Sequence, residues 1–385
     1  MPPSCQGALT SPGRPAAGPR RTRNLYFDLL RSLAIVRVVA YHCLGLAWLT
    51  VAFPAVGVMF ALSGSLMAAS LDRAGRAAVA HRLRRLLPPV WMLAAVCVPV
   101  MVAGGMRLDW SVLLWLFPLQ DPPVNGWGAA TLGMIWYLRE YLWFVLLSPL
   151  ALPAFRRRPM MCLLTPLGLL VVCTLTGIRP PGVISDLALY GGCWLLGFAQ
   201  HDGVLGRMRR STLLLTAGAL ATVGAGWFLT HPSARGYDLN DIPLGNALWT
   251  MAFLLILLGV APSWWQERQR REGARQGREP GLPWMARVLT AVNSRVMTVY
   301  LWHQTAIGVT VVAASWSGIQ LTGLSGRLLL LTGVAALIVV AVVGFGWVED
   351  LAARRRPAII PHGERTRAAP PAAQPEPAMV AVASG

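Results

Sequence analysis

Long apolar runs separated by short polar connections dominate the sequence. A helix needs about 20 apolar residues to cross a bilayer, and ten runs approach that length. They cover residues 27–50, 54–71, 86–104, 132–153, 160–176, 184–200, 211–230, 243–264, 295–315 and 325–347. A weaker run at 110–119, punctuated by proline and glycine, predicts a half-helix or an interfacial segment. The pattern therefore predicts an all-α membrane protein, a bundle of about ten transmembrane helices.

The composition also favours lipid rather than water around most of the chain. Of the 385 residues, 13% are charged and 55% are hydrophobic, whereas a soluble protein carries about 25% charged residues. The six cysteines are scattered without a C-x-x-C pair, so we expect neither a disulfide framework nor a metal site. The first 24 residues lack the apolar core of a signal peptide, so the first span is expected to stay attached.

The basic residues are all arginines, and the net charge is +18. If the N-terminus is cytoplasmic, the connections on the cytoplasmic side hold 26 arginines. The opposite connections hold only Arg107, Arg179 and Arg235. This asymmetry follows the positive-inside rule and predicts that both termini lie in the cytoplasm. We expect a multi-pass protein of the plasma membrane. We do not expect it to bind nucleic acid, because membrane topology already explains the positive charge.

The chain divides into three predicted parts. We expect residues 1–24 to form a disordered basic tail and residues 25–350 to form the membrane domain. Residues 351–385 are expected to form a disordered tail rich in Ala and Pro. Such tails have too little apolar surface to bury. No internal repeat is visible, which weakens a reading as an inverted-repeat transporter.

Ionisable side chains inside spans are costly, so they mark candidate functional positions. The first span contains Asp28, Arg31, Arg37 and His42. Helical geometry places Arg31 and His42 about 20° apart on one face and about 16 Å apart along the axis, so one long substrate can contact both. Asp28, one turn before Arg31, is expected to pair with it. Arg37 points about 140° from His42 and is expected to pack or pair elsewhere.

Other spans carry further polar groups. Ser63 lies among small residues that permit close helix approach, so a structural and a functional role are equally expected. Arg139 and Glu140 are adjacent and point about 100° apart, so they should face different neighbours. The ninth span contains Tyr300 and a second imidazole, His303. For a single buried imidazole, the alternative is a structural group bonded to a backbone carbonyl.

These positions resemble the motifs of the integral-membrane acyltransferase 3 family, over essentially residues 24–350. The resemblance begins with the R-x10-H arrangement of Arg31 and His42. The other matching segments are residues 57–64 (GVMFALSG), 82–91 (RLRRLLPPVW), 136–138 (WYL) with 146–150 (LLSPL), and 300–303 (YLWH). Each motif alone is weak, but five in the same order on a ten-span scaffold are specific.

The resemblance implies an enzyme that moves an acyl group from acyl-CoA to a hydroxyl of a carbohydrate, a glycolipid or a glycosylated secondary metabolite. His42 would be the catalytic base, and a neutral imidazole with a reference pKa of about 6.5 suits that work. Arg31 would hold the donor or stabilise negative charge. Arg82 and Arg85 would bind the phosphates of CoA, with an ordinary positive-inside flank as the alternative.

The remaining candidates have open roles. The further catalytic candidates are Glu140 and His303, and the supporting candidates are Asp28, Ser63 and Tyr300. The fourth span departs from the commoner family version with paired acidic residues, so Glu140 either orients one of the imidazoles or neutralises an arginine. The expected partners are the acyl-CoA co-substrate, a hydroxylated or glycosylated acceptor and the lipid bilayer, with no bound cofactor and no metal.

Two further expectations concern the extent and the class of the protein. The soluble esterase-like C-terminal extension of some family members is not expected, because nothing after Asp350 can form a core. The alternative function is a multi-span transporter or exporter of a small anionic or acylated solute, motivated by the buried charges and broken helices.

Overall fold

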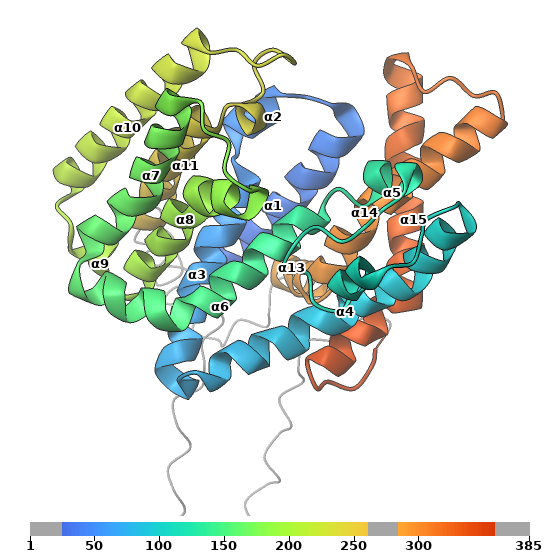
Figure 1. The fold of residues 1–385 in the computed structure, drawn as a ribbon, viewed down its shortest axis with the longest axis horizontal. Coiled ribbons are helices and arrows are strands. Elements are labelled where there is room, and N and C mark those ends of the chain that lie inside the picture. The colour runs from blue at the N-terminus through green and yellow to red at the C-terminus, as the bar shows by residue number, and fades with distance from the viewer. Residues whose placement is uncertain (1–24, 261–283, 359–385) are drawn as a thin grey trace, which may run out of the picture.

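The computed structural model describes residues 25–260 and 284–358, which are almost entirely helical and contain no β-strand. The elements are α1 Leu25–Leu44, α2 Trp48–Ala52, α3 Ala55–Ala74, α4 Ala77–Ala103, η1 Trp110–Trp115, α5 Gly126–Thr131, α6 Ile135–Arg157, α7 Pro159–Thr176, α8 Gly182–His201, α9 Val204–Arg207, α10 Arg210–Thr230, η2 Leu239–Asp241, α11 Pro243–Gly259, α13 Trp284–Ser294, α14 Val296–Trp316 and α15 Gly323–Ala352, where η marks a 3-10 helix. The predicted all-α membrane bundle is confirmed (Figure 1).

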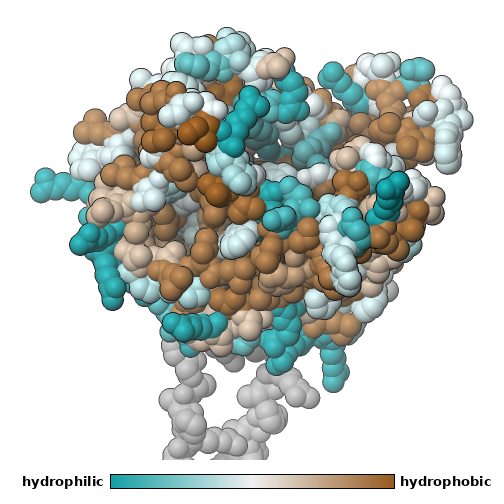
Figure 2. All heavy atoms as spheres, viewed as in Figure 1, coloured by the Kyte–Doolittle hydropathy of each residue, from teal (hydrophilic) through white to brown (hydrophobic). Residues whose placement is uncertain are grey.

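Each of the ten predicted apolar runs forms a helix. Eight segments of the described chain are long and apolar enough to cross a membrane. They are residues 48–74, which join α2 to α3, and helices α4, α6, α7, α8, α10, α14 and α15. Helix α11 is apolar but shorter, and α1 carries three charged side chains. In Figure 2, hydrophobic residues cover much of the middle of the molecule, and hydrophilic residues gather toward its upper and lower edges.

Two predicted boundaries differ from the structure by more than five residues. The first run was expected to continue to residue 50, but α1 ends at Leu44. Gly45 follows with φ +64° and donates its backbone N–H to the carbonyl of Tyr41 at 2.8 Å, which is a left-handed helix stop. Helix α4 begins at Ala77, nine residues before the predicted residue 86. Its first turns are rich in alanine and arginine, which are strong helix formers but not apolar enough to extend a hydrophobic run.

Helix α1 lies between two groups of helices. On one side it packs against α3, which packs against α8, and α11 and α10 follow outward. On the other side it packs against α13, α14 and α15, and α4 also contacts this group. Figure 1 shows α10 at the left, α14 and α15 at the right, and α1 between them. The space-filling view is hollowed between the upper end of the α14–α15 pair and the rest of the bundle (Figure 2).

The arginines separate toward the two ends of the bundle. One end contains the start of α1 and the junction between α3 and α4, and we call it the arginine-rich end. Its described arginines in helix ends and connections are Arg73, Arg76, Arg82, Arg84, Arg85, Arg156, Arg157, Arg158, Arg207, Arg209, Arg210, Arg354, Arg355 and Arg356. The opposite end has Arg107, Arg179, Arg235 and, in the second turn of α15, Arg327. The cytoplasmic placement of the arginine-rich end stays a prediction, and most of the two predicted tails lies outside the described residues.

Candidate active site

Two imidazoles from different helices meet where α1 packs against α14. His42 lies in the last turn of α1, and His303 lies in the second turn of α14. Their ring centroids are 5.3 Å apart. His303 is completely buried, whereas the side chain of His42 is exposed. The pair therefore combines one imidazole that a substrate can reach with one that is enclosed by protein.

The hydrogen bonds of His303 determine its tautomer. Its Nδ1 lies 2.6 Å from the backbone carbonyl of Tyr300. A carbonyl oxygen only accepts hydrogen bonds, so Nδ1 carries the proton and Nε2 keeps a lone pair. Nε2 is buried and has no hydrogen-bond partner within the described chain. Because Nε2 of His303 is an unused acceptor beside His42, it can accept a hydrogen bond from that histidine or from a substrate.

Gln304 is the polar side chain that contacts His42 directly. Its carbonyl oxygen accepts from the backbone N–H of Met134 at 3.0 Å, so the amide NH2 faces His42. That nitrogen lies 3.5 Å from Nδ1 and 3.4 Å from Nε2 of His42. These contacts are long and shared between the two nitrogens, so they leave the imidazole free to bond to a substrate hydroxyl.

A line of aromatic rings leads from the histidine pair toward Arg31. His303 is 5.6 Å from Tyr300, and Tyr300 is 5.0 Å from Tyr137, measured between ring centroids. The Tyr300 hydroxyl donates to the carbonyl of Met134 at 2.9 Å. Tyr137 lies beside Ser63 and is an electrostatic neighbour of Arg31. The structure thus places five of the predicted site residues, Arg31, His42, Ser63, Tyr300 and His303, along one polar path.

The arginine-rich end of this path is strongly cationic. The electrostatic neighbours of Arg31 include Arg82 and Asp28. Those of Arg85 include Arg82 and Arg355, from the start of α4 and the chain after α15. Arg82 also donates to the hydroxyl of Ser70 at 3.4 Å. Four guanidinium groups that repel one another therefore lie together where the chain enters the bundle: those of Arg31, Arg82, Arg85 and Arg355. Such an arrangement is suited to binding a polyanion.

Glu140 lies apart from the histidine pair. Both of its carboxylate oxygens are buried, and they have no hydrogen-bond partner in the described chain. Its electrostatic neighbours are Asp186 and Arg139. Arg139 instead forms ion pairs with Asp121 and Asp186. The structure does not bring Glu140 into contact with either imidazole, so its catalytic role stays a prediction.

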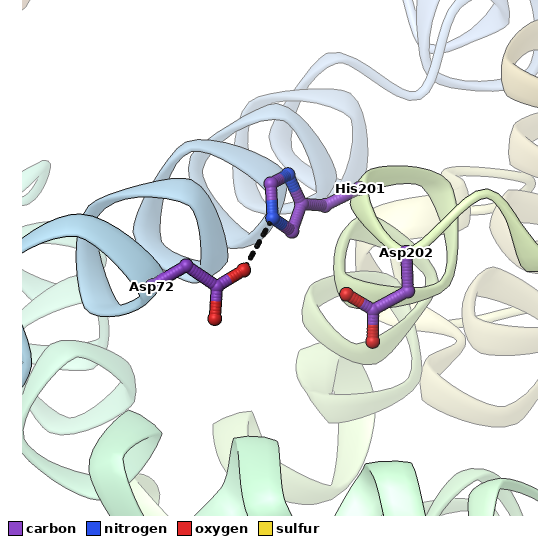
Figure 3. A group of neighbouring side chains, drawn as sticks. All are labelled: Asp72, His201 and Asp202. Carbon is purple, nitrogen blue, oxygen red and sulfur yellow. Dashed lines mark hydrogen bonds and ion pairs between the residues drawn. The ribbon is translucent and has the colours of Figure 1, made fainter.

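Asp72, His201 and Asp202 bring three groups of metal-ligand chemistry together at the arginine-rich end (Figure 3). His201 Nε2 lies 2.8 Å from a carboxylate oxygen of Asp72. Arg156 bonds to both carboxylates, at 2.8 Å from Asp72 and 2.7 Å from Asp202. We assign no metal site here, because the guanidinium already supplies the positive charge between the carboxylates. These ion pairs join the ends of α3, α6 and α8.

Sequence reasoning missed two residues of the site. Gln304 was not singled out, although it directly follows His303 in the YLWHQ segment. Tyr137 was noted only as part of a motif, yet it joins Ser63 to Tyr300. The position of Gln304 next to the intramembrane His303 could have identified it as a site residue, because polar residues in a span generally face the protein interior.

The fold and the buried polar path define a multi-pass membrane protein with a line of polar and aromatic side chains inside a helical bundle. A family model described as an acyltransferase domain, of the acyltransferase 3 type, matches residues 24–348. The chain therefore belongs to this family and is a membrane acyltransferase. No curated protein and no solved structure matches the chain.

Proposed function

We propose that the protein transfers an acyl group from acyl-CoA to a hydroxyl of a carbohydrate, a glycolipid or a glycosylated secondary metabolite. The observation that carries this proposal is the pairing of an accessible imidazole with a buried one, 5.3 Å apart, at one end of the polar path. The cationic group of Arg31, Arg82 and Arg85 at the other end supports a phosphate-bearing donor.

The proposed chemistry is direct acyl transfer. His42 accepts the proton of the acceptor hydroxyl as its oxygen attacks the thioester carbonyl. The tetrahedral intermediate collapses, the C–S bond breaks, and the proton on His42 passes to the departing CoA sulfur. His303 acts as a positioning residue through its contact with His42, because its own Nδ1 is held by the carbonyl of Tyr300. The products are an ester and free CoA thiol.

The test of this function is release of CoA thiol by the purified protein in lipid. Acetyl-CoA, propionyl-CoA and longer acyl-CoAs are supplied in turn with a crude extract of the source cells. We expect release that depends on both donor and extract, with one chain length preferred. A folded protein that consumes no acyl-CoA but moves a solute across vesicles would replace the proposal with the transporter alternative.

For the donor site, we expect Arg85→Gln to raise the KM for acyl-CoA by about 10- to 100-fold, with a smaller change in kcat. A charge-assisted bond to phosphate contributes about 1.5–3 kcal/mol, and it acts equally on bound substrate and transition state. Arg84→Gln is the matched control, because Arg84 is an exposed neighbour on the same helix that points about 100° away. Equal KM changes in the two variants would instead indicate a general loss of positive charge.

A further inference from the structure

A small polar pocket at the opposite end of the bundle contains a buried guanidinium that the proposed reaction does not use. Arg37 lines this pocket from α1, and residues of α2, α3, α8, η2 and α11 complete it. Its other polar side chains are Thr50, Tyr190, Asn240 and Asn246. The interior volume is about 10 Å³, which is the space of one water-sized group.

Arg37 has no ion-pair partner within the described chain. The residue is 8% exposed, and its Nε donates to the carbonyl of Leu49 at 3.1 Å. Its guanidinium lies 5.1 Å from the centre of the Tyr41 ring. Asp238 is an electrostatic neighbour, but its carboxylate accepts from the Tyr41 hydroxyl at 2.6 Å and from the backbone N–H of Asn240 at 3.0 Å. A buried cation without a paired anion is costly in a membrane domain.

The other polar groups of the pocket are mainly hydrogen-bond donors. The amide oxygen of Asn246 accepts from the Thr250 hydroxyl at 2.9 Å, which leaves its N–H groups for other partners. Tyr190 lines the same pocket beside Asn246. The hydroxyl of Thr50 is already used twice by backbone groups, and no carboxylate lines the pocket. A guanidinium surrounded by amide and phenol donors suits an oxygen anion and not a cation.

The pocket lies close to the candidate base. Arg37 is an electrostatic neighbour of His42 on the same helix, and Tyr41 contacts both side chains. Only one oxygen-sized group fits inside, so the rest of a ligand stays at the rim, where Asn240 is exposed. A ligand held by one charged group at Arg37 therefore has its remaining atoms outside the pocket, at this rim.

We propose that the Arg37 pocket binds an anionic oxygen, carboxylate or phosphate, of the acyl acceptor, so that the acceptor is an acidic carbohydrate. This inference rests on the proposed acyltransferase function. It deepens that function by assigning the acceptor's charge to a specific side chain. The anion supplies the direct ion pair that Arg37 lacks within the described chain, and it selects charged acceptors over neutral ones of the same size.

The test measures binding without any acyl donor, so it stays informative if the turnover assay fails. The protein is purified in a non-ionic, phosphate-free detergent and titrated with galacturonate, galactose or glycerophosphocholine. We expect galacturonate to raise the unfolding temperature in a saturable way and galactose to leave it unchanged. Arg37→Gln should abolish the galacturonate effect. Arg235→Gln is the control, because Arg235 is an exposed arginine at the same end that pairs with Asp241.

A second variant keeps the test valid if Arg37→Gln does not fold. Tyr190→Phe removes one O–H donor from the pocket but keeps the ring, and we expect it to weaken galacturonate binding at least threefold. Equal effects of galacturonate and galactose, or an unchanged galacturonate effect in both variants, would overturn the proposal. Stabilisation by glycerophosphocholine alone would also overturn it, because the pocket would then hold a lipid headgroup.

Discussion

Replacing His42 with alanine should lower acyl-CoA-dependent CoA release by about 10²- to 10⁴-fold, which is the usual contribution of a general base. The fold should survive, because His42 is exposed and its contacts with Gln304 are only 3.4 to 3.5 Å long. Its removal leaves Gln304 bonded to the backbone of Met134. The loss should therefore fall on kcat, while acyl-CoA binding at the arginine-rich end is retained.

The matched control is His231→Ala. His231 is an exposed histidine that stacks on Trp227 at 3.8 Å, in the connection after α10. We expect wild-type turnover from this variant and an unchanged unfolding temperature in both. A His42→Ala protein that binds acyl-CoA and turns it over at the wild-type rate would remove His42 from the chemistry. His303→Ala would then become the next variant to measure.

The fold was largely predictable because the bilayer imposes a strict length and polarity on each span. The ten apolar runs all became helices. The errors occur where a helix is too short, or too polar at one end, to be found as a continuous apolar run. Helix α13, Trp284–Ser294, was missed because it is too short to register as an apolar run. Helix α4 starts in a segment that contains Arg82, Arg84 and Arg85, which the search for apolar residues could not include.

The site was predictable only within single helices. The spacing of Arg31 and His42 followed from helical periodicity, which relates residues of one element. The meeting of His42 with His303 and Gln304 depends on how α1 packs against α14, and one sequence does not contain that information. The same limit explains Glu140. Its polarity and its adjacency to Arg139 were evident, but its neighbour on α8, Asp186, was not.

Replacing Gly197 with valine should destabilise the protein by more than about 3 kcal/mol, beyond the usual cost of an overpacked core. Helices α3 and α8 cross where glycines from both face the other backbone. A Cβ at Gly197 would lie 2.1 Å from the carbonyl oxygen of Ala61, and one at Gly64 would lie 2.3 Å from that of Trp194. Backbone atoms cannot move aside like the end of a flexible side chain, so the two helices would have to separate.

This separation should also reach the candidate active site, because α3 carries Ser63, which lies beside Tyr137. The matched control is Gly218→Val on α10, where an added Cβ meets nothing within 4 Å. Both variants introduce the same β-branched residue into a helix, so the difference between them isolates the crossing. We expect a lower unfolding temperature and loss of turnover only for Gly197→Val. Equal unfolding temperatures would mean that α3 and α8 can separate without cost, and that the close crossing does not hold the site together.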